Sequence, residues 1–202
     1  MNVNNLKPDL KFNKNNAEIY YYSNYFNDKQ ANTLLDEFIK KIEWSQNSIS
    51  LFGKKHFLPR LEAWYGDVGL SYSYSGIKHK SMIWTSSLLS IRECIQNDFN
   101  LKFNSVLMNY YRTGIDSNGW HSDDEKELGE NPIIASLSFG ASRKFKFKHK
   151  SLKGNNSKLD IILNHGSLLL MLGSTQHFWK HCIPKTKDII NPRINLTFRF
   201  VF

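Results

Sequence analysis

The stretch "RINLTFRFVF", residues 193–202, decides the fold because polar and apolar side chains alternate along it. The polar ones recur at every second position: Arg193, Asn195, Thr197 and Arg199. The apolar ones stand between them: Ile194, Leu196, Phe198 and Phe200. Successive side chains of a β-strand point to opposite faces, so this strand has one apolar and one polar face. In an ordinary sheet the polar face meets solvent, whereas in a barrel mouth it would line a pocket whose two guanidinium groups suit a dicarboxylate.

Short β-rich runs of this kind fill the second half of the chain and are separated by turns rich in Gly, Asn and Ser. The other runs are "NSVLMNYY" (104–111), "IIASLSF" (133–139), "KFKFKH" (144–149), "LDIIL" (159–163), "SLLLML" (167–172) and "FWKHCI" (178–183). About seven or eight strands at this spacing predict an antiparallel sandwich or barrel rather than alternating βαβ units.

Two amphipathic helices are predicted before residue 100. In residues 27–44 apolar side chains follow a helical period, with Asn27 or Asp28 as the N-cap: Ala31, Leu34, Leu35, Phe38, Ile39 and Ile42. Residues 85–99 repeat the pattern, with Thr85 as the candidate cap. We expect both helices to buttress one sheet of a mainly β domain.

Length and composition predict one domain spanning residues 1–202, large enough for a sizeable core. A formal net charge of +9 is compatible with an acidic partner such as nucleic acid. The two cysteines, Cys94 and Cys182, form no C-x-x-C pair, which favours a reduced intracellular setting, the cytoplasm of a bacterium or the nucleus of a eukaryote.

The first fifteen residues are polar and are expected to be loosely ordered. They lack the apolar core of a signal peptide. The longest apolar run, "LLLML" at 168–172, is too short to span a membrane. We therefore expect no membrane contact. We also expect a monomer.

The segment "WHSDDEKELG", residues 120–129, contains a candidate metal-binding pair. His121 and Asp123 are two residues apart, so on an extended segment both can reach one cation. The run "HFWKHCIP" offers His177 or His181 as a third ligand. Two histidines and one carboxylate leave open positions on an octahedral ion, as in non-haem Fe(II) oxygenases. The simpler interpretation is a surface H-x-D pair and a core histidine, as most isolated pairs are.

Neutral donors for the same anion pocket are offered by "MNYYRTG", in which Asn109 and Tyr111 again stand two apart. The alternative is an asparagine paired within the sheet and a packed tyrosine.

Taken together in this order, the motifs N-x-Y, H-x-D, the distal His and R-x-N-x-T-x-R resemble the AlkB family of Fe(II)/2-oxoglutarate dioxygenases. The resemblance runs from about residue 50 to the end of the chain. The sequence looks most like those mammalian members of the family that repair alkylated nucleic acids. The blocks that carry it are "LFGKKHFLPRLEAWYGDVGLSYSYSG" (51–76), "NYYRTGIDSNGWHSDDEKELG" (109–129), "PIIASLSFGASRKF" (132–145) and "NPRINLTFRF" (191–200).

The resemblance implies a double-stranded β-helix (jelly-roll) core with a nucleotide-recognition lid over residues 47–76. It assigns Fe(II) to His121, Asp123 and His181. It assigns 2-oxoglutarate to Asn109, Tyr111, Arg193, Thr197 and Arg199, with Asn195 supporting the pocket. It assigns the damaged base and its strand to Phe52, Gly53, Lys54, Tyr72, Ser73, Tyr74, Asp124 and Glu125. His177 receives no role and is expected to be structural.

The lid also has a physical interpretation of its own. "SISLFGKKHFLPR", residues 48–60, is typical of a β-hairpin, and an apolar tip at Leu51 and Phe52 could fill the stack left by an extruded base. Alternatively, Phe52 folds back onto the core, and Tyr72 and Tyr74 are core residues. Lys55 stands where the resemblance expects an aromatic residue, which leaves the strand contacts open.

The expected function is oxidative demethylation of 1-methyladenine and 3-methylcytosine in DNA, with RNA as an alternative, using Fe(II), 2-oxoglutarate and dioxygen and releasing formaldehyde and succinate. Asp124 and Glu125 would favour a cationic lesion. The alternating lysines of residues 143–150 and the following loop could contact phosphates or form an ordinary solvated face. Other functions left open are a protein or lipid demethylase of the same family, a non-repair 2-oxoglutarate hydroxylase, a sandwich enzyme with another metal, and a non-catalytic nucleic-acid-binding module.

Overall fold

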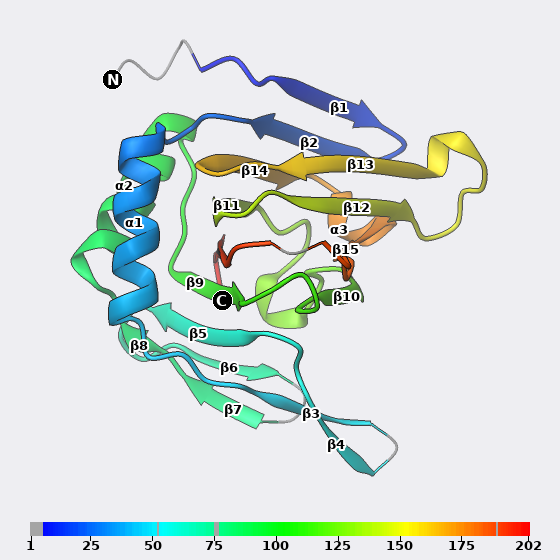
Figure 1. Cartoon of the computed structure of the whole chain (residues 1–202). Helices are drawn as coiled ribbons and strands as arrows, with labels where there is room; N and C mark the ends of the chain where they lie inside the picture. The colour runs from blue at the N-terminus through cyan, green and yellow to red at the C-terminus, as the bar shows by residue number, and fades with distance from the viewer. Residues whose placement is uncertain (1–5, 52, 75–76, 189) are drawn as a thin grey trace.

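Two antiparallel sheets packed face to face form the body of the protein in a computed structural model that describes residues 6–51, 53–74, 77–188 and 190–202 (Figure 1). Within these residues the large sheet has eight strands in the order β1-β2-β14-β11-β16-β9-β5-β8. Their bounds are β1 Leu10–Lys14, β2 Ala17–Tyr22, β14 Ser167–Leu172, β11 Ile134–Gly140, β16 Arg193–Arg199, β9 Ser105–Tyr111, β5 Leu61–Gly66 and β8 Met82–Ile83. All neighbours pair antiparallel except β5 and β8, which are parallel.

The small sheet has the order β10-β15-β12-β13. Its strands are β10 Asn118–His121, β15 Trp179–Ile183, β12 Arg143–His149 and β13 Lys158–Leu163. Short helical turns lie in the connections: η1 Lys126–Leu128, η2 Asn155–Ser157 and α3 Thr175–Phe178. A buried apolar cluster that includes Phe147, Leu169 and Trp179 fills the space between the sheets. The predicted mainly β, jelly-roll class is confirmed.

Both predicted helices are present and cover the outer face of the large sheet (Figure 1). Helix α1, Asp28–Lys41, begins with a capping box in which the Asn27 side chain accepts from the Gln30 amide. Helix α2, Ser86–Phe99, begins at Thr85, whose hydroxyl accepts from the Leu88 amide. Phe38 and Leu88 are buried against alternate side chains of the sheet, so the helical period provides the second core layer.

The alternating strand β16 lies inside the large sheet, between β11 and β9. Its apolar face packs toward the helices, where Ile194, Leu196 and Phe198 are fully buried. Its polar face is turned away from solvent too, because Arg193 is only 1% exposed. The sheet-edge interpretation of this strand is therefore wrong, and its polar side chains lie between the two sheets.

Two parts of the chain differ from the expectations. Residues 10–14, inside the stretch expected to be loose, form β1 and pair with β2 along their whole length. Within 47–76, strand β5 belongs to the large sheet and buries Tyr65, so residues 61–66 are part of the core, and the lid function of the other residues stays a prediction. In both cases pairing with a neighbouring strand, and not a hydrophobic pattern within the segment, determines that the segment forms a strand.

The remainder of 47–76 forms two hairpins. The predicted hairpin exists as β3 Ser48–Leu51 paired with β4 Lys54–Phe57, and a second one pairs β6 Ser71–Tyr74 with β7 Ile77–Lys80. Gly53 adopts φ +73° at the first tip, a conformation that favours glycine. Phe52 lies outside the described residues, as do the side chains of Leu51, Tyr72, Ser73 and Tyr74.

No helix in the described part of the chain is both long and apolar enough to cross a membrane.

Candidate metal centre and carboxylate pocket

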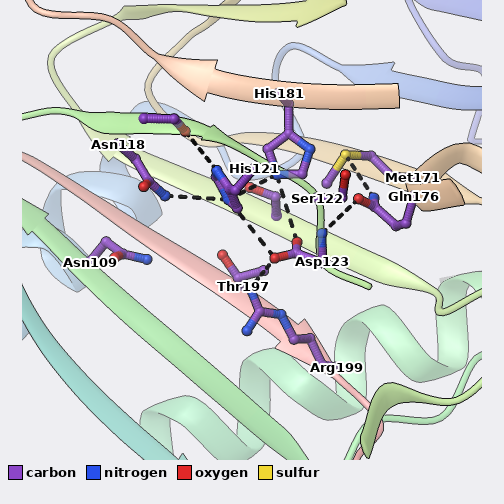
Figure 2. A network of polar contacts seen from close by, with 12 residues as sticks. Asn109, Asn118, His121, Ser122, Asp123, Met171, Gln176, His181, Thr197 and Arg199 are labelled. Carbon is purple, nitrogen blue, oxygen red and sulfur yellow. Dashed lines mark hydrogen bonds and ion pairs between the residues drawn. The ribbon is translucent and has the colours of Figure 1, made fainter. Parts of the chain in front are cut away.

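The three predicted metal ligands meet at the edge of the small sheet. His121 ends β10 and pairs with His181 in β15, and Asp123 follows two residues later (Figure 2). The two Nε2 atoms lie 3.1 Å apart. Asp123 Oδ1 lies 3.9 Å from His121 Nε2, and Oδ2 lies 3.8 Å from His181 Nε2. One potential ligand atom from each residue therefore lies within 4.8 Å of the other two, which is close enough for a shared cation.

Neighbouring backbone groups orient these ligands. His121 Nδ1 lies 2.8 Å from the Gly119 carbonyl oxygen, so the tautomer that donates there leaves the Nε2 lone pair directed at the site. The backbone N–H of Asp123 donates to Gln176 Oε1 at 3.0 Å, which fixes the turn after β10 (Figure 2). Supporting contacts of this kind orient the ligands of metal sites.

The protonation states suit a divalent cation. Burial, together with His121 and Arg199, lowers the pKa of His181 to about 3, although Asp123 opposes the change. Burial raises the pKa of Asp123, but the Arg199 cation and, after it, the nearby His181 and His121 outweigh burial and hold that pKa below its usual range. A neutral imidazole and an ionised carboxylate are the forms that bind metal, and this donor set fits Fe(II) with open positions.

Arg199 contacts the metal-site carboxylate itself. Its Nη2 donates to Asp123 Oδ1 at 2.6 Å, and the side chain borders the cavity described below. The resemblance assigned Arg199 to 2-oxoglutarate, and that role stays a prediction. What the structure adds is a positioning contact, since the guanidinium fixes one carboxylate oxygen and leaves Oδ2 for a cation.

Arg193 has hydrogen-bonding capacity that the described residues do not use. Its Nη2 donates to Ser138 Oγ at 2.9 Å, while Nε and Nη1 are buried without a hydrogen-bond partner among those residues. The guanidinium lies over the Tyr111 ring, 5.1 Å from its centroid. Burial lowers the pKa of Arg193 to about 10, and the nearby Tyr111 opposes the shift. A buried cation with unused donors fits a carboxylate, the predicted partner of this residue.

The buried Arg143 differs because the protein itself satisfies it. Arg143 Nη2 donates to the carbonyl oxygens of Asp116 and Pro184 at 2.9 and 2.7 Å, which holds the loop leading into β10. Arg143 is therefore a structural arginine, whereas Arg193 has two nitrogen atoms without a partner among the described residues.

A second buried network, which the sequence did not indicate, orients Asn109. Arg60 Nε donates to Asn109 Oδ1 at 2.8 Å, and Arg60 Nη2 forms an ion pair with Glu62 Oε1 at 2.7 Å. Glu62 Oε2 accepts from Asn47 Nδ2 at 3.0 Å, one residue before the β3–β4 hairpin. With its oxygen engaged by Arg60, the Asn109 amide keeps its N–H groups for another acceptor.

The side chains of Asn195 and Thr197 form hydrogen bonds to the neighbouring strand and to each other. Asn195 Nδ2 donates to Ser136 Oγ at 2.8 Å and to the Leu137 carbonyl oxygen at 2.6 Å. Thr197 Oγ1 donates to Asn195 Oδ1 at 3.1 Å. Asn195 is thus tied to the sheet, and its role in supporting a 2-oxoglutarate pocket stays a prediction.

A cavity of about 330 Å³ lies between the sheets, and Arg193 is not among the residues that border it, although Tyr111, which lies under the Arg193 guanidinium, is. It is bordered by the three metal ligands and by Asn109, Tyr111, Asn195, Thr197 and Arg199. Three carboxylates also border it: Glu43, Glu62 and Glu125. The cavity is large enough for a small dicarboxylate beside a metal ion, and its acidic lining suits a cationic group.

The predicted base-recognition pair is divided by the structure. Glu125 borders the cavity, and its Oε2 is buried without a hydrogen-bond partner among the described residues. Asp124 is exposed and pairs with Lys150 Nζ at 2.9 Å, so it is not brought into the cavity. Gly53 and Lys54 are exposed on the β3–β4 hairpin, and His177 is exposed on α3.

Comparisons with known proteins agree with this geometry. The family model described as "2OG-Fe(II) oxygenase superfamily" matches residues 18–199. The human protein named DNA oxidative demethylase ALKBH2 is 39% identical over 186 residues, 88% of this chain and 71% of that protein. The bovine protein named alpha-ketoglutarate-dependent dioxygenase alkB homolog 3 is 41% identical over 181 residues, 86% of this chain and 63% of that protein.

A solved structure, that of OsALKBH1, shares the fold with a TM-score of 0.64 at 14% identity, over 90% of this chain and 97% of that one. The metal triad, the buried Arg193 and these sequence relatives lead to one conclusion. The chain belongs to the 2OG-Fe(II) oxygenase superfamily and, within it, to the AlkB homologues.

Proposed function

We propose that the chain is a DNA oxidative demethylase that removes methyl groups from the ring nitrogens of 1-methyladenine and 3-methylcytosine. The observation that carries the proposal is Glu125, which borders the same cavity as the metal triad and whose buried Oε2 has no hydrogen-bond partner among the described residues. Relatives named DNA oxidative demethylase and alkB homolog 3 support it.

Each group of residues has a separate task in this proposal. His121, Asp123 and His181 would hold Fe(II), and Arg193 would bind the distal carboxylate of 2-oxoglutarate. The chemistry that Fe(II), 2-oxoglutarate and dioxygen supply when bound is hydroxylation of the N-methyl carbon, with release of succinate and carbon dioxide. The hydroxymethyl group then leaves the base as formaldehyde, and the ring nitrogen recovers its unmethylated form. The protein holds the methyl carbon beside the metal and excludes other groups.

Selectivity follows from charge. Methylation at these positions makes the base cationic, so the Glu125 carboxylate, which has one buried oxygen, stabilises the damaged base more than the neutral one. Asp124 is already paired with Lys150 at the surface, so we assign it no part in this discrimination.

The test is formaldehyde release from oligonucleotides that carry 1-methyladenine, in single and double strands of DNA and in RNA. Replacing Glu125 by Gln should lower kcat/KM by about 10- to 100-fold, the loss expected for one charge-assisted hydrogen bond. The matched control, Asp124→Asn, should keep wild-type activity on the same oligonucleotide. Absence of formaldehyde with every methylated oligonucleotide would contradict the proposed function, and activity on RNA alone would replace DNA by RNA as substrate.

A further inference from the structure

The outer face of the small sheet is strongly basic. Strand β12 alternates as predicted: the side chains of Arg143, Phe145, Phe147 and His149 are buried, and those between them are lysines. The inner side chains pack between the sheets, and the Phe145 ring stacks on the imidazole of His181. The lysines therefore point outward, on the side of the sheet opposite to the cavity.

The strand register places three of these cations directly opposite one another. Lys148 of β12 pairs with Lys158 of β13 on one side and with Lys180 of β15 on the other. We call Lys158, Lys148 and Lys180 the lysine row. Adjacent strands are about 4.8 Å apart, so the row spans about 10 Å across the sheet.

The row carries an electrostatic cost. Like charges directly opposite on neighbouring strands destabilise a sheet. Among the described residues, no carboxylate lies within 4.0 Å of the three ammonium groups, whereas the neighbouring Lys144 and Lys150 pair with Asp160 and Asp124. Three adjacent cations without an acidic partner form a favourable site for a polyanion.

An exposed aromatic side chain extends the row toward the cavity. Trp120 of β10 is 42% exposed, and Lys148 Nζ lies 4.4 Å from the centroid of its ring. Lys148 points outward, so its contact with Trp120 places the indole on the outer face of the small sheet, whereas the next residue, His121, borders the cavity. A chain that leaves the cavity across this edge would meet Trp120 first and the lysine row next.

We propose that Trp120 and the lysine row bind the backbone of the nucleic acid that flanks the damaged base. The inference rests on the proposed function for the identity of the polyanion. The row offers three cations, so it can neutralise up to three phosphates of one strand. The indole of Trp120 can stack on a flanking base of any sequence.

The experiment measures binding of undamaged, labelled single-stranded DNA at increasing salt, without any demethylation step. Replacing Lys148, Lys158 and Lys180 together by Gln should reduce the slope of log affinity against log salt by about 2, at about 0.7 per lost phosphate contact. The matched control replaces Lys29, Lys40 and Lys41 of α1 by Gln, which removes the same charge from the helix layer and should leave the slope unchanged. Trp120→Ala should weaken binding about tenfold at every salt concentration.

Activity on short substrates separates the two proposals. The nucleoside 1-methyladenosine has no phosphate and no flanking base, so the triple lysine variant should release formaldehyde from it at the same rate as the α1 control variant. Equal salt slopes for the two triple variants would overturn the role of the lysine row and leave demethylation intact. The role of the lysine row would also be overturned if the triple lysine variant lost affinity for anionic lipid vesicles but kept its affinity for DNA. Salt-dependent binding through the row, without formaldehyde from any substrate, would instead contradict the proposed function alone.

Discussion

Arg199 Nη2 and Asp123 Oδ1 lie 2.6 Å apart, so the last residue of β16 fixes the carboxylate of the metal triad. The contact joins the large sheet to the turn that follows β10 in the small sheet (Figure 2). It neutralises one oxygen of a carboxylate that is otherwise buried and leaves the other for the cation. Arg199 is thus a positioning residue for the metal.

Replacing Arg199 by Lys should weaken binding of Co(II), used in place of Fe(II), by about 10- to 100-fold, as loss of a contact behind a metal ligand typically does. Lys keeps the charge but cannot hold the carboxylate with a planar fork. Calorimetric titration of the metal measures the effect, and Arg92→Lys, which lies outside the cavity lining, is the control. Equal metal affinity in both variants would show that Asp123 needs no such contact.

Replacing Arg193 by Lys should raise KM for 2-oxoglutarate by about 10- to 100-fold, because two nitrogen atoms of the buried guanidinium have no partner among the described residues, and an ammonium cannot reproduce their planar arrangement of donors. Succinate formation against 2-oxoglutarate concentration measures KM, and Co(II) affinity should stay at the wild-type value. If the variant lost metal binding and kept its KM, Arg193 would serve the metal site instead.

Replacing Glu62 by Gln should destabilise the protein by about 3 kcal/mol, since it leaves the buried Arg60 cation without its partner. It should also raise KM for 2-oxoglutarate, because Arg60 would no longer hold the Asn109 amide in one orientation. The double variant Arg60→Met with Glu62→Leu should regain stability and keep the raised KM. Recovery of both would mean that the network acts through stability alone.

The loop before β10 should be sensitive to acid, because it contains the buried carboxylate of Asp116. Burial raises its pKa, but hydrogen bonds from the backbone and side chain of Arg112 outweigh this and hold the pKa below 3.8. The stabilisation is therefore complete above about pH 4 to 5 and is lost as pH falls through the lowered pKa. Asp116→Asn should cost about 1 to 3 kcal/mol of unfolding free energy at pH 7 and progressively less toward pH 3, measured by urea denaturation. A cost that is constant over this range would rule out an ionised Asp116 as its source.

The parts of the fold that the sequence predicted are those with a local signature. Alternation identified β16 and β12, and the helical period with its caps identified α1 and α2. Strand β5, "LEAWYG", lies in the sheet interior and is largely buried on both faces, so it shows no alternation and was assigned to the lid.

The candidate site divides in the same way. His121, Asp123 and His181 were found because their spacing and chemistry are specific, and their convergence is confirmed. Arg60 and Gln176 were missed, since each acts on a partner about fifty residues away that only the folded sheet brings close. Asp124 and Glu125 were grouped as neighbours, yet successive side chains of an extended segment point to opposite sides, as they do here.

The metal triad and the buried Arg193 are proposed to couple 2-oxoglutarate turnover to demethylation of a cationic base. The most direct measurement follows succinate and formaldehyde together from a 1-methyladenine oligonucleotide with Fe(II) and dioxygen. The expected result is one formaldehyde and one restored adenine for each succinate, with loss of all three products in His181→Ala. Succinate formation that the methylated base does not stimulate, or full demethylation by His181→Ala, would contradict it.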